Sequence, residues 1–269
     1  MPLDSRQLAD DIAAAFRDRR PIVPPVARDP AFDVAAAYAV EAELARRRIA
    51  DGRRIVGRKV GFANKALWRV LKLETLVWAH MYDDTVWFAQ NGEASLSIGH
   101  MHAPKIEPEI VIKVGRASEP VGSSDVGHAI EWIALGFEII DCPYPDWKFQ
   151  PADFVAAYGL HAALVVGEAR RLEPEMIEQL ATFKVMLSKN GEVVAQGSGR
   201  NVLRSPILCL QELSAAAAGR VPPDPIVTGE IISTGTLTES QPMAAGETWS
   251  ARVDGIDLPA LLVRIEPSR

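Results

Sequence analysis

The sequence predicts an α+β protein, and three observations lead to this fold class. Long helical patterns occupy the first 54 residues, short alternating apolar runs dominate the remainder, and later helical patterns do not alternate strictly with the strand patterns. We therefore expect a helical N-terminal arm over residues 1–54 and a mostly β body over residues 55–269.

Two helices account for the arm. The first is expected over residues 5–20, where apolar side chains repeat at helical spacing behind the potential caps Asp4 and Ser5. A proline-rich extended segment follows. The second helix is expected over residues 33–48, which again carry apolar side chains along one face.

Short runs punctuated by glycine predict the strands of the body. The runs over residues 107–114 and 134–141 are among the clearest, and Asn190-Gly191 between two alternating runs is a strong β-hairpin signal. Helices are expected to interrupt the strands over residues 66–73, 124–134, 173–181 and 206–218.

Composition narrows the class of protein. The chain has 269 residues, 48% of them hydrophobic, which is enough for one large core or two modest ones. A net charge of −6, with basic clusters that are only short, at 17–20 and 46–54, disfavours a nucleic-acid surface. Both clusters are interpreted as solvated helix faces.

The sequence also indicates where in the cell the protein is expected. No apolar run approaches the ~20 residues that span a bilayer, and the N-terminal segment is acidic where a signal peptide would be basic, so we expect a cytoplasmic protein. Cys142 and Cys209 have neither disulfide-framework nor zinc spacing and are expected to be buried thiols.

Three glutamates predict a metal site. Glu107 and Glu109 alternate with apolar residues, so both point to the same face of a strand. Glu138 lies inside an apolar run, and a carboxylate among apolar neighbours needs a partner or a cation. Three carboxylates with water suit Mg²⁺ or Mn²⁺ better than zinc. The alternative is a solvated strand edge.

Lys59 is the candidate acid or base beside this site. It stands between Gly57 and Gly61, whose missing side chains let a ligand or another backbone approach closely. Burial or neighbouring cations would lower the pKa of such a lysine enough for proton transfer. The alternative is an exposed lysine among neighbouring arginines.

Two further segments offer groups for a ligand. The hydroxyl-rich run from Ser233 to Thr238 can hold a carboxylate through hydroxyls and backbone N–H groups, although a plain turn has the same composition. His100 and His102, followed by Glu107, resemble a cupin metal motif, which would imply oxygen chemistry on iron or manganese.

Taken in order, Lys59, the Glu107 and Glu109 pair and Glu138 make the chain resemble the fumarylacetoacetate hydrolase superfamily. The resemblance is to its branch of 2-keto-4-pentenoate hydratases and 4-oxalocrotonate decarboxylases. The matching segments cover nearly everything after about residue 50 and include GRKVGF, HMYDDTVW, APKIEPEIVIKV, EWIALGFEIID and EIISTGTLT.

The resemblance implies a mixed β-roll or sandwich catalytic body, a divalent ion on the three glutamates and a homo-oligomer. It also implies Lys59 near a small 2-oxo acid from aromatic compound catabolism, with Gly61, Phe62, Gly235 and Thr236 beside that substrate. No nucleic-acid or membrane partner is expected.

Departures from the family pattern fall near the chemistry. The Leu76 to Ala79 segment lacks an aspartate that many members carry, and Cys142 to Trp147 replaces the usual serine and arginine. Asp84 and His161 are therefore candidates, with Lys59, for moving protons.

Hydration of a 2-hydroxy-2,4-dienoate is the favoured reaction, because a divalent ion on a 2-oxo acid stabilises the enolate that hydration requires. A decarboxylase of an oxo-enedioate would also need a cation for the second carboxylate, a role that neither Arg58 nor Lys65 can be given from sequence. The remaining alternatives are a C–C hydrolase using His161, a cupin-like oxygenase and a non-catalytic ligand binder.

Overall fold

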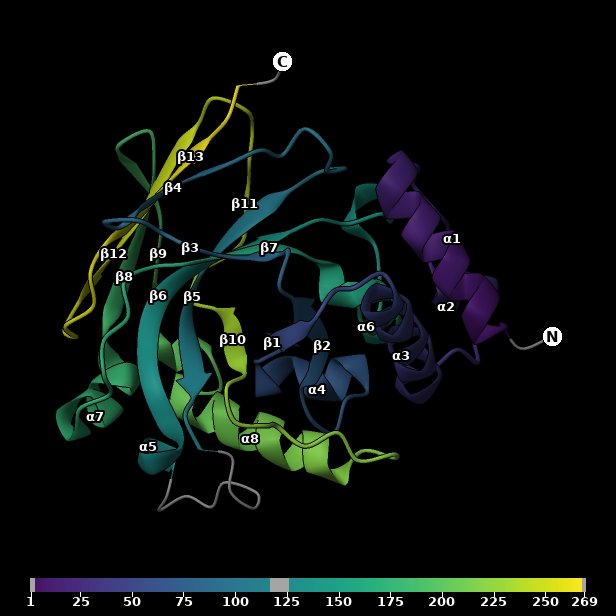
Figure 1. Ribbon diagram of the computed structural model, residues 1–269, viewed down its shortest axis with the longest axis horizontal. Helices are drawn as coiled ribbons and strands as arrows, with labels where there is room; N and C mark the ends of the chain where they lie inside the picture. The colour runs from purple at the N-terminus through teal and green to yellow at the C-terminus, as the bar shows by residue number, and fades with distance from the viewer. Residues whose placement is uncertain (1–2, 117–125, 268–269) are drawn as a thin grey trace.

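The computed structural model describes residues 3–116 and 126–267, and these residues form two sheets with helices around them (Figure 1). The larger sheet has the strand order β2-β1-β10-β5-β6-β7-β3, with β11 beside β5, and the smaller has the order β4-β13-β12-β8-β9. The expected α+β class is confirmed.

The strands of the larger sheet are β1 (Ile55–Gly61), β2 (Val77–Tyr82), β3 (Val86–Phe88), β5 (Lys105–Val114), β6 (Ile130–Ile140), β7 (His161–Val166), β10 (Ile231–Thr236) and β11 (Gln241–Pro242). Those of the smaller sheet are β4 (Glu93–Leu96), β8 (Lys184–Lys189), β9 (Glu192–Ser198), β12 (Thr248–Asp254) and β13 (Leu261–Ile265). The expected hairpin at Asn190-Gly191 joins β8 to β9, and both turn residues have positive φ.

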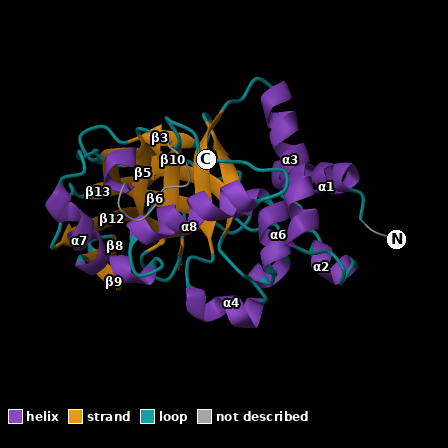
Figure 2. Ribbon diagram, turned by 90° about the horizontal axis from the view of Figure 1, so that it is seen from below, coloured by secondary structure: helices purple, strands orange, loops and turns teal. Residues whose placement is uncertain are grey.

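The helices are α1 (Ser5–Asp18), α2 (Pro25–Arg28), α3 (Val34–Ala50), α4 (Lys65–Leu71), α5 (Val126–Ala129), α6 (Pro151–Ala156), α7 (Pro174–Thr182) and α8 (Pro206–Gly219). Helices α1, α2 and α3 gather beside β1 and β2, and α8 crosses the sheet near β10 (Figures 1 and 2).

Side-chain caps explain where the arm helices begin. The Asp4 carboxylate accepts a hydrogen bond from the N–H of Gln7 at the start of α1, and that of Asp33 accepts one from Ala36 at the start of α3. Helix α3 packs against both α1 and α6. The division at residue 54 stays a prediction, since α6 belongs to the body.

The helix expected over residues 124–134 is wrong. Residues 124 and 125 lie outside the described part of the chain, α5 covers one turn, and from Ile130 onward the chain is strand β6. Strand β6 pairs with β5 in an antiparallel register from Ile130 to Ile140. This pairing buries β-branched Ile130 and Ile133, so long-range strand contacts override the local pattern.

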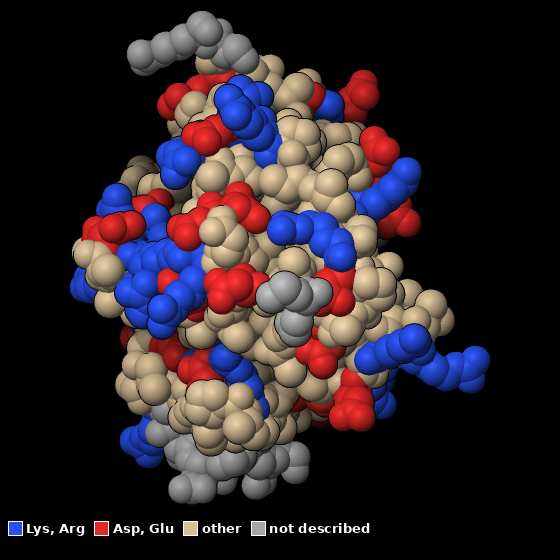
Figure 3. All heavy atoms as spheres, turned by 90° about the vertical axis from the view of Figure 1, so that its right-hand side faces the viewer, with Lys and Arg blue, Asp and Glu red and all other residues tan. Residues whose placement is uncertain are grey.

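The arm carries mixed charges on its surface. Figure 3 shows basic and acidic side chains interspersed on the face that α1 and α3 help to form. Arg47 of α3 pairs with Asp10 of α1 at 2.5 Å and with Glu43 at 2.9 Å. The basic clusters are therefore solvated and largely matched by carboxylates, as the sequence suggested. No helix among the described residues is long and apolar enough to cross a membrane.

The centre of the larger sheet is buried and mainly apolar, which draws attention to the charged residues inside it. Side chains such as Ile106, Ile110 and Phe137 are fully buried. The two cysteines are also buried and free, as expected. Charged side chains nevertheless lie at this depth on β1, β5 and β6.

Candidate metal centre and its cavity

The three predicted glutamates meet on the two central strands of the larger sheet. Glu107 of β5 lies directly opposite Glu138 of β6, and Glu109 lies opposite Gly136, two residues further along. One carboxylate oxygen from each glutamate lies within 4.8 Å of the others. Glu109 and Glu138 are fully buried, and Glu107 is partly open to a cavity.

Strand β10 holds Glu109 in place. The Ser233 hydroxyl donates to Glu109 Oε2 at 2.5 Å, and the backbone N–H of Gly235 donates to the same oxygen at 2.8 Å. Glu109 Oε1 is buried without a hydrogen-bond partner. The hydroxyl-rich run expected to bind a substrate carboxylate thus binds one of the protein's own carboxylates through two of its members.

Glu138 is held from two sides. His161 on β7 lies with Nδ1 2.9 Å from Glu138 Oε1, and Lys59 on β1 lies with Nζ 3.0 Å from Glu138 Oε2. The contact with Lys59 is an ion pair, and Glu138 Oε2 has no hydrogen-bond partner beyond it. The contributing strands β1, β10, β5, β6 and β7 are consecutive in the sheet.

Lys59 is 2% exposed, so the alternative of a surface lysine is wrong. Its ammonium donates to the carbonyl of Gly159 at 3.0 Å and lies 4.8 Å from the ring centroid of Phe154. Gly159 has a φ of +60°, and a Cβ placed there would lie 2.7 Å from the Lys59 side chain. Glycine at this position therefore gives the lysine room to reach the carboxylates.

Burial and crowding shift the protonation of the cluster. Burial raises the pKa of Glu107 to about 7 and raises the pKa of Glu109 well above its usual range. For Glu138, the effect of burial is outweighed by the charge of Lys59 and the hydrogen bond from His161, so its pKa is lowered. The cluster thus combines one stable carboxylate with two that hold protons readily.

Lys59 itself titrates in the opposite direction from the one expected. Burial acts to lower the pKa of Lys59, but the charges of Glu138, Glu107 and Glu109 outweigh it, and the pKa is raised. The expectation of a lowered lysine pKa is therefore wrong for the metal-free chain, in which Lys59 carries its proton at neutral pH.

A divalent cation fits this donor set. The cluster has three carboxylates against one ammonium, and two of its buried oxygens lack hydrogen bonds. Buried polar atoms without partners are rare in folded proteins and are explained when an ion or water completes them. All-oxygen ligands suit Mg²⁺ or Mn²⁺, and Mg²⁺ binds oxygen at about 2.0–2.1 Å.

A cavity of about 830 Å³ opens beside the cluster. Its lining includes all four residues predicted to bind substrate, namely Gly61, Phe62, Gly235 and Thr236, together with Lys59, Lys105, Glu107, Ile140, Trp147, Phe149, Phe154 and Leu160. Arg58 and Lys65, the cations weighed for a second carboxylate, are not in this lining. Arg58 is bound by Glu230 and Asp224, and Lys65 pairs with Glu212.

The remaining proton-transfer candidates face a second cavity, of about 450 Å³. Asp84 lines it and pairs with Arg48 and Arg53, so the structure does not bring Asp84 to the glutamates. His161 lines the same cavity and links it to Glu138. Its Nδ1 contacts Glu138 Oε1, and its Nε2 lies 3.0 Å from Oγ1 of Thr85, which also lines this cavity. His161 is thus a partner of Glu138 on the side away from the larger cavity.

The histidines of the cupin alternative do not join the carboxylates. His102 Nε2 lies 3.1 Å from the carbonyl of Ala15, and His100 lines the second cavity. Among the described residues, the group able to hold a metal consists of the three glutamates.

Sequence reasoning missed two groups of residues at this site. Ser233 was expected to bind a substrate carboxylate, and its hydrogen bond to Glu109 was not predicted. The two residues meet because β10 pairs with β5, over 120 positions away in the sequence. Lys105 was overlooked although the period of two places it on the face of Glu107 and Glu109. That period was the available signal.

Comparison with known families decides the relationship. Residues 78–262 match the family described as Fumarylacetoacetate (FAA) hydrolase C-terminal. The chain belongs to this family. The resemblance seen in the sequence is confirmed.

Curated members of the family share much of the chain. A 2-hydroxyhexa-2,4-dienoate hydratase from Comamonas testosteroni is 28% identical over 246 residues, covering 90% of each chain. A 4-oxalocrotonate decarboxylase from a Pseudomonas species is 29% identical over 234 residues, covering 87% of this chain and 88% of its own.

Solved structures agree with this placement. The 4-oxalocrotonate decarboxylase from Pseudomonas putida G7, complexed with magnesium and adipate, superposes with a TM-score of 0.87 at 29% identity and 97% coverage of both chains. A fumarylpyruvate hydrolase from Pseudomonas aeruginosa, with Mn²⁺ and pyruvate, has a TM-score of 0.57 at 15% identity, with 78% of this chain and 89% of that chain covered. The second match shows the shared fold alone.

Proposed function

We propose that this protein is a metal-dependent lyase that hydrates a 2-hydroxy-2,4-dienoate. The observation that carries the proposal is the cluster of three glutamates, two of whose buried oxygens lack hydrogen bonds, placed beside Lys59 at the wall of a large cavity. Relatives that are similar over most of their length are named as hydratases and decarboxylases, which supports a lyase.

Glu107, Glu109 and Glu138 would hold Mg²⁺ or Mn²⁺. A divalent ion bound there would polarise the oxygens of a 2-oxo acid and stabilise the negative charge that develops on it. A related decarboxylase has been solved with magnesium, which supports the choice of ion.

Lys59 supplies the proton in this proposal. Its ammonium lies 3.0 Å from Glu138 and lines the cavity, so it is close to any ligand held by the glutamates. A positioned acid of this kind contributes roughly 10²–10⁴-fold to a rate. Phe62, Phe154 and Leu160 give the same cavity apolar walls, which would hold the carbon chain.

His161 is proposed to position Glu138 and not to activate water. Its Nδ1 is 2.9 Å from Glu138 Oε1, and its Nε2 faces Thr85 in the second cavity. A C–C hydrolase would need this histidine beside the substrate, so the geometry favours the lyase. Asp84, paired with arginines, is proposed to have no part in proton transfer.

Decarboxylation is the second candidate, because the cavity contains a further cation, Lys105, and because relatives are named 4-oxalocrotonate decarboxylase. Product mass separates water addition from CO₂ release. The absence of turnover on every acid tested would leave the non-catalytic ligand binder.

A homo-oligomer acting on small molecules of aromatic catabolism, in the cytoplasm, remains part of the proposal. Trp87 and Phe88 support self-association, since they are 43% and 52% exposed on edge strand β3. A molar mass in solution equal to that of one chain would contradict it.

The direct test substitutes a proposed ligand. Glu138→Gln should lower Mg²⁺-supported loss of the dienoate ultraviolet chromophore at least about 100-fold, because an essential electrostatic group is lost. Glu131→Gln is the matched control, since Glu131 is an exposed glutamate on the same strand. Circular dichroism should show both variants folded. Full activity in Glu138→Gln would exclude Glu138 as a necessary ligand.

A further inference from the structure

Aromatic side chains from four separate segments line the second cavity, of about 450 Å³. Phe16 comes from α1, Tyr82 from the end of β2 and Trp87 from β3, and Tyr158 lies in the turn just before β7. Phe16 and Tyr158 meet edge to face, with ring centroids 5.8 Å apart. The volume is that of a small-molecule site, roughly 300–1,000 Å³, and the walls suit a flat ring.

Tyr82 brings a hydroxyl without a partner to this cavity. The residue is 3% exposed, and its phenol makes no hydrogen bond within the described part of the chain. Among the described residues, the fully enclosed oxygens without partners belong to Glu109 and Glu138, so the Tyr82 hydroxyl touches open space, which is the cavity that Tyr82 lines. Burial raises the pKa of Tyr82, so the hydroxyl keeps its proton and stays a donor. An acceptor on a ligand would complete it.

Arg48 of α3 brings positive charge to the same wall. Its guanidinium lies 4.8 Å from the centroid of the Tyr82 ring and pairs with Asp84. Arg53 pairs with the same carboxylate at 3.1 Å, and neither arginine pairs with another carboxylate in the described part of the chain. Two guanidiniums therefore share one carboxylate. Arg48 gives Asp84 one hydrogen bond out of five N–H donors, which leaves donors for an anion.

The other acidic and basic groups of the lining do not cancel this surplus. The carboxylate of Asp141 is occupied by backbone N–H groups of residues 102 and 103. The charge of His80 is matched by Glu41 and Asp224. Arg17, whose side chain is mostly exposed, pairs with Asp18. The anion that the cavity favours would therefore be held by Arg48 and Tyr82.

The turn that carries Tyr158 is strained. Tyr158 and Leu160 have φ values of +55° and +57°, a left-handed conformation that favours glycine. Strain of this kind is maintained by the surrounding structure and clusters at ligand sites. Here the turn places Tyr158 in the wall of the second cavity, while the carbonyl of Gly159 accepts a hydrogen bond from Lys59. One turn thus contributes to both sites.

We propose that the second cavity binds a single-ring aromatic carboxylate, with the ring against Phe16 and Tyr158 and the carboxylate at Tyr82 and Arg48. This site is separate from the metal centre, and the inference goes beyond the proposed function without depending on it. An aromatic acid matches both parts of the lining, because rings pack against rings and a carboxylate accepts hydrogen bonds from a phenol and a guanidinium.

Calorimetry with benzoate on the full, metal-free chain tests the assignment. Removal of metal keeps benzoate from binding as a ligand of an ion at the glutamates. Benzoate should bind at least about tenfold more tightly than benzamide, which has its shape without its charge. It should also bind about threefold more tightly than cyclohexanecarboxylate, which has its charge without an aromatic ring.

Tyr82→Phe is the decisive variant because it removes only the hydroxyl. It should weaken benzoate about tenfold and leave benzamide binding unchanged. Urea unfolding should show unchanged stability, since that hydroxyl has no hydrogen bond to lose within the described residues. Arg48→Met should weaken benzoate at least as much. The control is Lys105→Met, which removes a cation from the larger cavity and should leave benzoate binding unchanged.

Three outcomes would overturn the inference. The first is the absence of benzoate binding to the unchanged protein, and the second is equal binding of benzoate and benzamide. The third is benzoate binding that is weakened by Lys105→Met and unaffected by Tyr82→Phe, which would place the acid in the larger cavity.

Discussion

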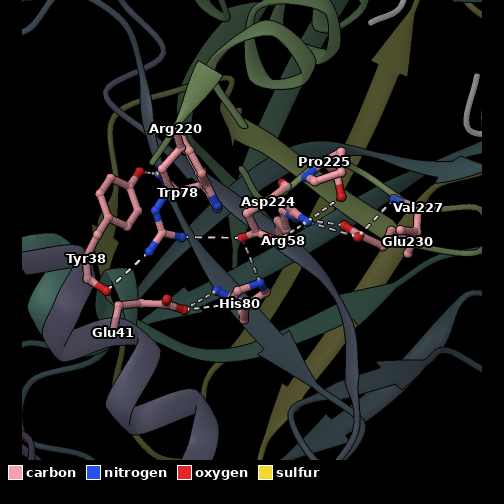
Figure 4. A network of polar contacts seen from close by, with 10 residues as sticks. All are labelled: Tyr38, Glu41, Arg58, Trp78, His80, Arg220, Asp224, Pro225, Val227 and Glu230. Atoms are coloured by element: carbon pink, nitrogen blue, oxygen red, sulfur yellow. Dashed lines mark hydrogen bonds and ion pairs between the residues drawn. The ribbon is translucent and has the colours of Figure 1, made fainter. Parts of the chain in front are cut away.

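Arg58 and Lys59 are neighbours on β1 and are each 2% exposed, yet their surroundings differ. Carboxylates match the charge of Arg58, whereas Lys59 faces more carboxyl groups than it can pair with. The Arg58 guanidinium donates to both oxygens of Glu230, to the Asp224 carboxylate and to the Pro225 carbonyl (Figure 4). Lys59 faces three glutamates, two of which retain oxygens without hydrogen bonds.

Alternation along the strand sends these two side chains to opposite faces of the sheet. On one face the buried charges are matched, and on the other three carboxyl groups share one ammonium, so that two of them hold protons readily. The comparison teaches that burial of charge alone does not identify a functional site. More acidic groups than basic ones at one buried place, together with unsatisfied atoms, mark a candidate ligand site.

The matched network also connects the arm to the body. His80 on β2 lies with Nδ1 2.6 Å from Glu41 of α3 and with Nε2 3.4 Å from Asp224 (Figure 4). Arg220 pairs with Asp224 and stacks 4.4 Å from the ring centroid of Tyr38, another α3 residue. The network therefore joins the arm to the body, whereas the glutamate cluster is proposed to bind a metal ion.

The largest expected effect is a loss of stability when the ion pairs of Arg58 are removed. Arg58→Met should lower the free energy of unfolding by about 3–5 kcal/mol, because it leaves Glu230 buried without its partner. Urea unfolding with and without Mg²⁺ should show the same loss. Lys59→Met is the comparison: added Mg²⁺ should recover much of its loss, since a cation compensates the remaining carboxylates. Recovery of Arg58→Met by Mg²⁺ would contradict the distinction between the two faces.

A smaller effect concerns pH. Burial acts to lower the pKa of His80, but hydrogen bonds and charges from Asp224 and Glu41 outweigh it and raise the pKa to about 9. Because this pKa lies above the unfolded value of 6.5, the stabilisation is fully present below pH 6.5 and is lost as pH rises through about 9. Its size is about 3 kcal/mol.

Chemical unfolding at several pH values checks this prediction. The unfolding free energy of the unchanged protein should fall between pH 6.5 and 9.5 by more than that of His80→Asn, which lacks the titrating group. Parallel curves for the two proteins would show that His80 carries no such stabilisation.

The smallest expected effect concerns metal affinity at the glutamate cluster. Ser233→Ala removes one of two donors to Glu109 Oε2 and should weaken Mn²⁺ binding about tenfold, since the backbone donor from Gly235 remains. Ser188→Ala, a buried serine on β8 of the smaller sheet, is the control. Unchanged Mn²⁺ affinity in Ser233→Ala would show that the hydroxyl does not orient the carboxylate.

Local patterns were sufficient for the parts of the site that depend on one strand. The period of two placed Glu107 and Glu109 on a common face, and the apolar neighbours of Glu138 indicated its burial. The order of these residues with Lys59 was enough to identify the family.

Local patterns could not predict contacts between residues that the order of the strands brings together. Lys59 reaches Glu138 across β10 and β5, and nothing local to either residue specifies that order. Asp84 was a candidate for proton transfer, but it pairs with Arg48 and Arg53 of the arm, and no local pattern shows this pairing. Long-range pairing also turned the expected helix after residue 124 into β6.

Gly159 is a position beside the site with little freedom to vary. Any other residue there would bring a Cβ against Lys59 and against Ala79, at 2.7 and 2.9 Å. A position with no reactive atom of its own is thus as constrained as the reactive lysine that it adjoins. Random mutagenesis scored by activity should consequently find the loop between α6 and β7 intolerant, even though chemistry alone would not mark it.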